Sequence, residues 1–282
     1  MNAIDVFQEW LDDYLNFEHN PKKDIFWLDT IDYLCKRFDN PQDAAPCIHV
    51  AGSKGKGSVS RMISCILDEA GYKTGLYSSP HITDFRERIS NAGKFFDEEI
   101  YEAAIKQMVP NIESIIPQSL PAERPITWFE LVTLYAFLCF KIAKVDWSVY
   151  EVGLGGRLDA TNVLRPKLCC ITPIELEHCE ILGNTLEEIA TEKAGIIKPG
   201  IPVVLQQQKS EAMAVFNKKA SSQNSRLLNI RDFTSIYDLN TTNSGINFKL
   251  IIRNKLNNEK PVTFKASFIR QYNGIQRILS QI

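Results

Sequence analysis

The stretch from Cys47 to Leu205 alternates short apolar runs with longer segments in which apolar residues recur at helical spacing. The apolar runs are only about five residues long and are bounded by polar residues, a length and pattern typical of buried strands. Strands that alternate with helices in this way indicate an α/β fold with a mainly parallel sheet. We predict strands at 48–50, 74–78, 147–151, 168–172 and 202–205.

Three segments between these runs have the pattern of helices. Apolar residues from 59 to 70 recur at intervals of three and four, as on one face of a helix. The segment 129–143 is almost entirely apolar but too short to cross a membrane, so we predict a helix in the core. Thr185 and Glu188 have the spacing of a capping box, which predicts a helix that begins there and ends near residue 194.

The pattern changes after about residue 209. Two runs with strand character, 246–252 and 261–266, are joined by the polar segment 254–260. This arrangement predicts a small antiparallel β appendage that closes the sheet. We therefore expect a core at about 45–208 and an appendage with a tail at 209–282.

Composition and charge narrow the class of protein. The chain has 282 residues, 44% of them hydrophobic, and a net charge of −2, so it has material for a packed core and no basic surface for nucleic acid. It has seven cysteines, an odd number, and no two of them have CxxC spacing, which indicates reduced thiols. The N-terminus is acidic rather than basic, and no apolar run is long enough to span a membrane. We expect a cytoplasmic, monomeric protein with small-molecule partners, no nucleic acid and no membrane.

A glycine-rich sequence, AGSKGKGS at 51–58, follows the first predicted strand and begins the first predicted helix. In that position glycines let backbone N–H groups converge on a phosphate, a lysine neutralises the terminal phosphates, and a serine can bind Mg²⁺. The usual P-loop has its Ser or Thr directly after the Lys, whereas Gly57 intervenes here. The alternative is a βα turn whose glycines serve only close packing. The predicted nucleotide contacts are Gly52, Lys54, Gly55, Lys56, Gly57 and Ser58.

This sequence resembles the P-loop of Mur-type amide ligases and folylpolyglutamate synthases, commonly GTNGKGS, with Lys54 in place of the Asn. The run EVGLGGRLDATN at 151–162 matches the folylpolyglutamate/dihydrofolate synthase branch without a gap. Further matches are SPH with ERI at 79–89, TWFE at 127–130 and EKAGI with KPG at 192–200, in the family's order. The resemblance covers about residues 10–208, and it favours the folate branch over cell-wall precursor ligases.

The resemblance implies a Mur-ligase-type ATPase domain that uses ATP and Mg²⁺ to add L-glutamate to a folate or dihydropteroate through an acyl phosphate. It implies metal ligands at Ser58, Ser79, Glu151 and His178. Lys193 would be the lysine that the family carbamylates, so that the implied catalytic residues are Lys56, Lys193 and His178. The implied substrate contacts are Thr127, Trp128, Phe129, Glu130, Leu158, Asp159 and Ala160.

Two features depart from the family pattern. The family's IGLDH is Ile-Glu-Leu-Glu-His here, with Glu175 for Gly and Glu177 for Asp, and we expect strain at Glu175 if the backbone there needs a positive φ. The added carboxylate of Glu177 could tighten or misplace the metal.

The family's enzymes also have a C-terminal α/β domain, which we expect to be missing from residues 1–282. Two readings therefore remain beside the ligase. One is a nucleotide-binding remnant or pseudoenzyme that binds Mg-ATP without ligation. The other is a different P-loop protein, such as a kinase or GTPase, against which the run at 151–162 argues. The choice between dihydropteroate and folate, and the number of glutamates added, stay open.

Overall fold

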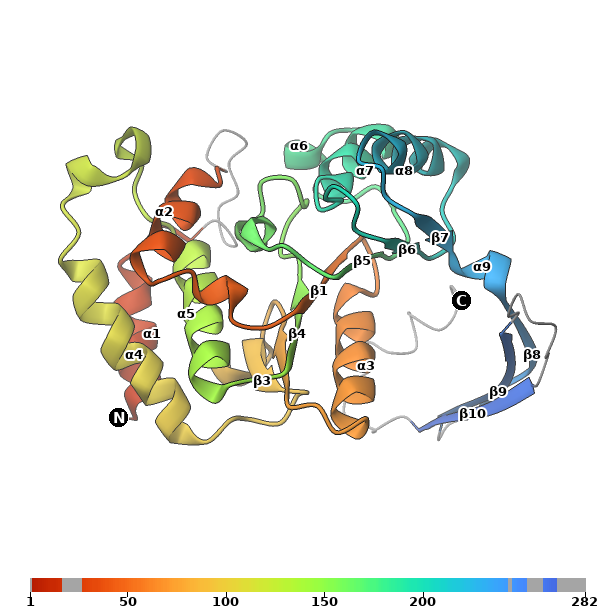
Figure 1. Cartoon of the computed structure of the whole chain (residues 1–282), viewed down its shortest axis with the longest axis horizontal. Helices are drawn as coiled ribbons and strands as arrows, with labels where there is room; N and C mark the ends of the chain where they lie inside the picture. Colours follow the sequence, from red (N-terminus) through yellow and green to blue (C-terminus); the bar gives the residue numbers. More distant parts are fainter. Residues whose placement is uncertain (1, 17–26, 243–244, 253–260, 268–282) are drawn as a thin grey trace.

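The computed structural model describes residues 2–16, 27–242, 245–252 and 261–267 (Figure 1). A seven-stranded sheet with the order β3-β2-β4-β1-β5-β6-β7 forms the centre of the molecule. All neighbouring strands in it are parallel except β2 and β3, which are antiparallel. Its strands are β1 (Cys47–Ala51), β2 (Thr74–Tyr77), β3 (Ile89–Asn91), β4 (Trp147–Glu151), β5 (Leu168–Ile171), β6 (Val203–Leu205) and β7 (Leu227–Asn229).

The predicted mainly parallel α/β sheet is therefore confirmed, and each predicted strand is present within one or two residues of its expected ends. Strand β1 is central, with β4 on one side and β5 on the other. Every residue of β1 is buried, as expected for a parallel strand covered on both faces. Because the strand order changes direction around β1, the carboxyl ends of β1, β4 and β5 form the edge at which such sheets bind ligands.

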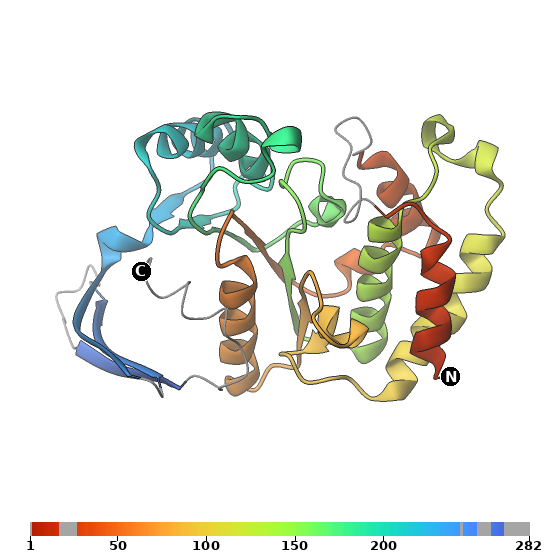
Figure 2. The same ribbon diagram turned by 180° about the vertical axis from the view of Figure 1, so that it is seen from behind.

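The main helices are α1 (Ala3–Asp12), α2 (Asp29–Arg37), α3 (Lys56–Glu69), α4 (Glu98–Glu113), α5 (Trp128–Ala143), α7 (Leu186–Ala194) and α8 (Ser210–Ser222). Short helical turns lie at η1 (Pro41–Asp43), η2 (Phe85–Arg88), η5 (Ala160–Val163), α6 (Cys179–Leu182) and α9 (Ile230–Phe233). Helix α3 packs against one face of the sheet, through a small apolar cluster that includes Val50 and Val149 (Figure 2). The opposite face is covered by α5 at β2 and β4 and by α7 and α8 at β5 and β6.

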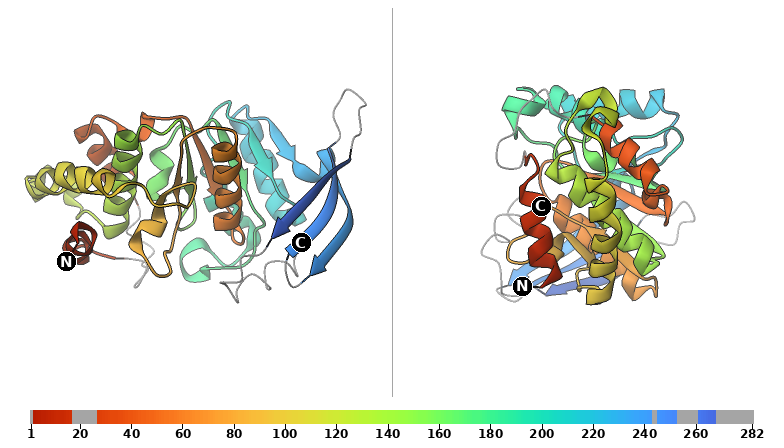
Figure 3. Two further views of the ribbon diagram at one scale, coloured as in Figure 1. Left: turned by 90° about the horizontal axis from the view of Figure 1, so that it is seen from below. Right: turned by 90° about the vertical axis from the view of Figure 1, so that its left-hand side faces the viewer.

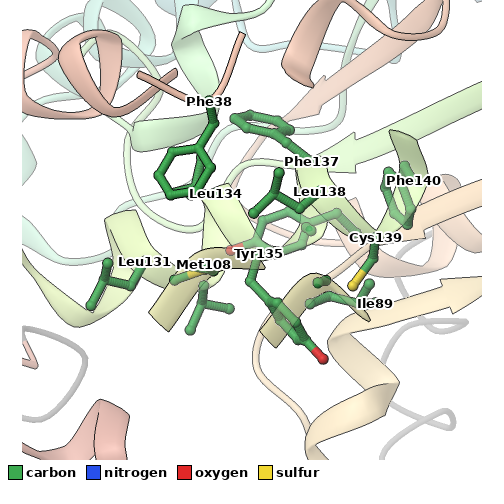
Figure 4. Packing of buried hydrophobic residues seen from close by; sticks show 14 of the residues in the cluster. Phe38, Ile89, Met108, Leu131, Leu134, Tyr135, Phe137, Leu138, Cys139 and Phe140 are labelled. Carbon is green, nitrogen blue, oxygen red and sulfur yellow. The ribbon is translucent and has the colours of Figure 1, made fainter. Parts of the chain in front are cut away.

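Helix α5 is the centre of the largest apolar cluster, which also includes residues of α1, α2 and α4 (Figure 4). Residues from Leu131 to Cys139 are 0% exposed without interruption. The prediction of a core helix is thus confirmed, and in the described part of the chain no helix is both long and apolar enough to cross a membrane. Gly75 of β2 lets α5 approach closely, because a Cβ there would lie 2.8 Å from the Phe140 ring.

Beyond residue 208 the structure differs from the expected division. Helix α8 packs beside α7, and β7 pairs in parallel with β6, so the core continues to Asn229. The sequence did not indicate this continuation, because α8 buries only Ala212, Phe216 and Ala220 and β7 is only three residues long, so neither gives a strong sequence signal.

The predicted antiparallel appendage is present as a separate sheet in the order β10-β9-β8. Its strands are β8 (Thr234–Thr242), β9 (Gly245–Ile252) and β10 (Pro261–Ser267). The prediction that it closes the main sheet was wrong, since it lies at the end of the molecule opposite α1 (Figures 1 and 3). Strand β8 was not predicted, because its polar positions outnumber its apolar ones. The predicted link 254–260 and the tail 268–282 lie outside the described residues.

Candidate active site

The glycine-rich loop connects the buried end of β1 to the start of α3, as the sequence predicts. Gly52 has φ +142°, and a Cβ on it would lie 1.8 Å from the Thr172 hydroxyl, so only glycine fits beside β5. Gly55 has φ +80° and precedes the first helical residue, Lys56. In the described residues no side chain caps this helix start, which leaves the N–H groups of its first turn to a phosphate.

Glu151 lies directly against this loop from the carboxyl end of β4. Its Oε2 atom would be 3.3 Å from a Cβ placed on Gly57. The Ser79 backbone N–H donates to the same oxygen at 3.2 Å. Gly57, the residue that separates this loop from the usual P-loop pattern, therefore makes room for the Glu151 carboxylate beside Ser58.

The buried position of Glu151 changes its protonation. Only 5% of the residue is exposed. Burial raises the pKa of Glu151 to about 7, while the Lys56 ammonium, the Ser79 N–H and the more distant Arg88 oppose the rise. Without a cation the carboxyl group is thus partly protonated near neutral pH, and a bound cation would favour the ionised form.

Lys193 reaches the same loop from α7 and is 1% exposed. Its ammonium donates to the Gly52 carbonyl at 2.8 Å and to Glu177 Oε1 at 2.8 Å. Burial lowers the pKa of Lys193 to about 8, with the Lys56 charge acting in the same direction and Glu177 against it. Lys193 therefore has an appreciable neutral fraction in mildly basic solution, the form in which an amine can react as a nucleophile.

The segment with the two unusual glutamates is fastened to the glycine-rich loop. The Ser53 hydroxyl donates to the Glu175 carbonyl and accepts from the Glu175 N–H, each at 3.0 Å. The Glu175 carboxylate lies 3.4 Å from the Lys54 ammonium. Glu175 is not among the residues with positive φ, so the expected strain there does not arise.

The matched runs at 151–162 and 192–200 pack backbone against backbone. A Cβ on Gly156 would lie 2.9 Å from the Glu192 carbonyl, and one on Gly195 would lie 2.4 Å from the Arg157 Cα. The Arg157 side chain donates to Glu192 Oε1 from two nitrogens, at 3.1 and 2.9 Å. Close packing of these glycines thus holds the end of α7, which carries Lys193, against the turn that follows β4.

Asp159 is buried at the centre of a hydrogen-bond chain. The Leu154 N–H donates to its Oδ2 at 2.9 Å, and the Thr161 hydroxyl donates to its Oδ1 at 2.5 Å. The Thr161 oxygen then accepts from His49 Nε2 at 2.8 Å. Burial lowers the pKa of His49 to about 3, so its ring is neutral. These hydrogen bonds fix the turn after β4. Nothing in the sequence indicated that His49 takes part in them.

The predicted substrate segment 127–130 forms the start of α5. The Thr127 hydroxyl and N–H both donate to Glu130 Oε2, at 2.7 and 2.8 Å, so these side chains close a capping box. Burial raises the pKa of Glu130. Phe129 is half-buried and lies against Gly153, where a Cβ would be 2.5 Å from its ring. Phe129 thus borders the turn after β4, and a contact with substrate stays a prediction for all four residues.

No family model matches the chain. The dihydrofolate synthase/folylpolyglutamate synthase of Bacillus subtilis is 39% identical over 242 residues, which cover 86% of this chain and 54% of that protein. A solved FPGS-AMPPCP-folate complex superposes with a TM-score of 0.81 at 32% identity, over 90% of this chain and 60% of that one. Folylpolyglutamate synthase of Mycobacterium tuberculosis complexed with ADP gives a TM-score of 0.77 at 31% identity, over 86% of this chain and 54% of that one. The chain is homologous to folylpolyglutamate/dihydrofolate synthases. It spans 54 to 60% of the length of these three proteins.

The donor atoms at the carboxyl edge of the sheet suit Mg²⁺ in part. The Glu151 carboxylate and the hydroxyls of Ser58 and Ser79 are hard oxygen donors. Glu151 lies against Gly57, the neighbour of Ser58, and accepts the backbone N–H of Ser79. His178 is exposed with φ 46°, and its carbonyl accepts the N–H groups of Ile181 and Leu182, each at 2.9 Å. No group of three or more His, Cys, Asp or Glu suited to a metal occurs among the described residues. Ser58, Ser79, Glu151 and His178 therefore stay predicted Mg²⁺ ligands, of which Glu151 has the contacts with the glycine-rich loop and the Ser79 segment described above.

Proposed function

We propose that the chain supplies the ATP-binding site of a ligase that adds L-glutamate to a folate or dihydropteroate. The observation that carries the proposal is the position of the Glu151 carboxylate, which lies against Gly57 of the glycine-rich loop and accepts the Ser79 N–H. The relatives are named folylpolyglutamate and dihydrofolate synthases, and one solved neighbour is a complex with AMPPCP and folate. All seven cysteines are unpaired, which suits the cytoplasm.

In the proposed reaction, a carboxylate oxygen of the folate or dihydropteroate attacks the γ-phosphorus of ATP, and ADP leaves. The amino group of glutamate then attacks the acyl carbon, loses a proton and displaces phosphate. The 52–58 loop and Lys56 would hold the phosphates of ATP, and the start of α3 would face them. Bound Mg²⁺ would supply positive charge at the transferred phosphoryl group, held by Glu151 with the hydroxyls of Ser58 and Ser79.

Lys193 has a distinct proposed role. Its ammonium lies between the Gly52 carbonyl and Glu177. Its lowered pKa gives a fraction of neutral amine, the form that reacts with CO₂. Carbamylation would replace a positive charge by a negative one and break the ion pair with Glu177. Whether the chain carries this modification can be read from its intact mass in bicarbonate buffer, with Lys193→Gln as the control.

The test of the function is formation of an amide bond. Purified chain is incubated with Mg-ATP, isotope-labelled glutamate and either dihydropteroate or a reduced folate, and products are separated by mass. The proposal predicts a product one glutamate heavier together with ADP. Mg-dependent ATP binding without any product would instead favour a nucleotide-binding remnant, a reading that the coverage of 54% of the Bacillus subtilis relative keeps open.

A further inference from the structure

Arg88 is one of the largest fully buried side chains among the described residues, at 2% exposed. It ends η2 and directly precedes β3. A buried guanidinium is retained only where its charge and its donors are satisfied. The groups that Arg88 contacts therefore indicate which segments it holds in place.

Arg88 holds both ends of the loop that carries Ser79. The Ser78 N–H donates to the Arg88 carbonyl at 3.0 Å. At the other end, Arg88 Nε donates to His81 Nδ1 at 2.8 Å. Because arginine can only donate, His81 Nδ1 must accept, and the histidine ring carries its proton on Nε2. Arg88 thus holds the segment 78–81 at one end through its backbone carbonyl and at the other end through its side chain.

The same guanidinium contacts the start of α5. Its central carbon lies 4.8 Å from the centre of the Trp128 ring, a cation–π geometry. Trp128 is one of the predicted substrate contacts and is itself buried. Arg88 therefore joins the Ser79 loop to the segment at 127–130.

Glu151 lies on the other side of this loop, where it accepts the Ser79 N–H. The positive charge of Arg88 is close enough to favour the ionised Glu151 carboxylate. One buried cation thus contacts the loop and the tryptophan, and its charge acts on the carboxylate that accepts the Ser79 N–H.

We propose that Arg88 is a positioning residue that holds the Ser78–His81 loop against Glu151 and Trp128, so that the Mg²⁺-dependent part of nucleotide binding depends on it. The inference rests on the proposed function. A residue with a merely structural role would change nucleotide affinity equally with and without Mg²⁺, so the ratio of the two affinities is the readout.

Arg86 offers a matched control two residues away in η2. It also stacks on an aromatic ring, with 4.5 Å from its central carbon to the Phe95 centroid. Its ion pairs are with Asp84 at 2.7 Å and Glu98 at 3.2 Å, and neither acid belongs to the proposed site. Arg86→Lys therefore also replaces a guanidinium that stacks on an aromatic ring, but one whose contacts do not include the Ser79 loop.

The experiment measures the dissociation constant of ATP by calorimetry, in Mg²⁺ and in EDTA, for wild type, Arg88→Lys and Arg86→Lys. For Arg88→Lys we predict that the Mg²⁺ enhancement of affinity falls about 10-fold to 100-fold, as for residues that orient metal ligands, while affinity in EDTA is kept. Arg86→Lys should keep the wild-type ratio. Equal losses in both buffers, or equal ratios in the two variants, would overturn the inference.

Two further variants keep the test decisive if Arg88→Lys does not fold. His81 is half-buried, so His81→Ala is compatible with folding and removes the acceptor of Arg88 Nε. It should lower the Mg²⁺ enhancement, and His81→Asn, which keeps an acceptor, should restore it. A wild-type ratio in His81→Ala would contradict the inference. Wild-type protein that shows no Mg²⁺ enhancement would instead contradict the proposed function itself.

Discussion

The interior beneath α5 and the carboxyl edge of the sheet are both buried, but they bury different chemistry. Under α5 the side chains are almost all apolar, and many are 0% exposed. At the edge, Glu151 is 5% exposed, Asp159 is 5% exposed and Lys193 is 1% exposed. Burial of apolar surface stabilises the fold, whereas burial of ionisable groups opposes it unless they are paired. The comparison indicates that the apolar interior under α5 stabilises the fold enough to offset the buried ionisable groups at the carboxyl edge, which are the groups suited to binding.

The largest expected effect comes from breaking the apolar interior. Leu134 of α5 is 0% exposed, and Leu134→Ala should cost about 3 to 5 kcal/mol of unfolding free energy through lost burial and a cavity. Urea denaturation followed by circular dichroism measures this loss. ATP affinity of the folded fraction should be unchanged. A strong loss of affinity at full folding would mean that the two regions are not separable as described.

The next effect concerns the tight contact at the edge. Gly52→Ala would place a methyl group 1.8 Å from the Thr172 hydroxyl, and we expect a loss of about 2 to 3 kcal/mol together with weaker ATP binding. Gly55→Ala is the control, since a Cβ there meets nothing within 4 Å and only the positive φ opposes it. Its cost should be about 1 kcal/mol. Equal stability of the two variants would show that Gly52 does not need its close contact.

A third prediction uses pH. The pKa of Glu151 is raised from 4.5 to about 7 by burial, so the folded protein binds more protons than the unfolded chain between these values. Stability should therefore fall by about 1 to 3 kcal/mol as pH rises from 4.5 to 7 in EDTA. Glu151→Gln should lack this component in otherwise identical thermal melts. A variant that keeps the full slope would assign the pH dependence to other groups.

The smallest effect separates two capping boxes of the same type. Thr127 caps α5 at a buried position, and Thr185 caps α7 at an exposed one. Thr127→Ala should cost about 1 to 2 kcal/mol because buried Glu130 loses its partner, and Thr185→Ala about 0.5 to 1 kcal/mol. Chemical denaturation of both variants tests the order. A larger loss in Thr185→Ala would contradict the importance of burial here.

The sequence predicted the elements whose pattern is strong. The strand that ends at Glu151, the apolar helix α5 and the capping box at Thr185 all follow from local periodicity or spacing, and the structure has them at the expected places. Strands β3 and β7 were not predicted, because each has three residues and is defined by its partner strand rather than by its own composition.

The candidate site residues could be named from the sequence, whereas their contacts with one another could not. The resemblance of the glycine-rich loop and of the run 151–162 named Ser58 and Glu151 as partners, and the structure places Glu151 against Gly57 of that loop at the carboxyl edge of the sheet. The ion pair between Lys193 and Glu177 and the contact between His49 and Thr161 depend on how distant segments meet, and no local pattern encodes them. His178 matches the family by sequence, and the structure places it exposed at the start of α6, so its part in a metal site stays a prediction.

The most direct test of the central claim is calorimetric titration of the chain with ATP in Mg²⁺, for wild type and for Lys56→Met. Lys56 is half-buried in the glycine-rich loop and lies close enough to Glu151 to affect its pKa. The account predicts one ATP per chain, affinity that falls when EDTA removes Mg²⁺, and loss of binding in Lys56→Met. Binding that is unchanged by Lys56→Met, or its absence in wild type, would contradict the assignment of this edge as an ATP site.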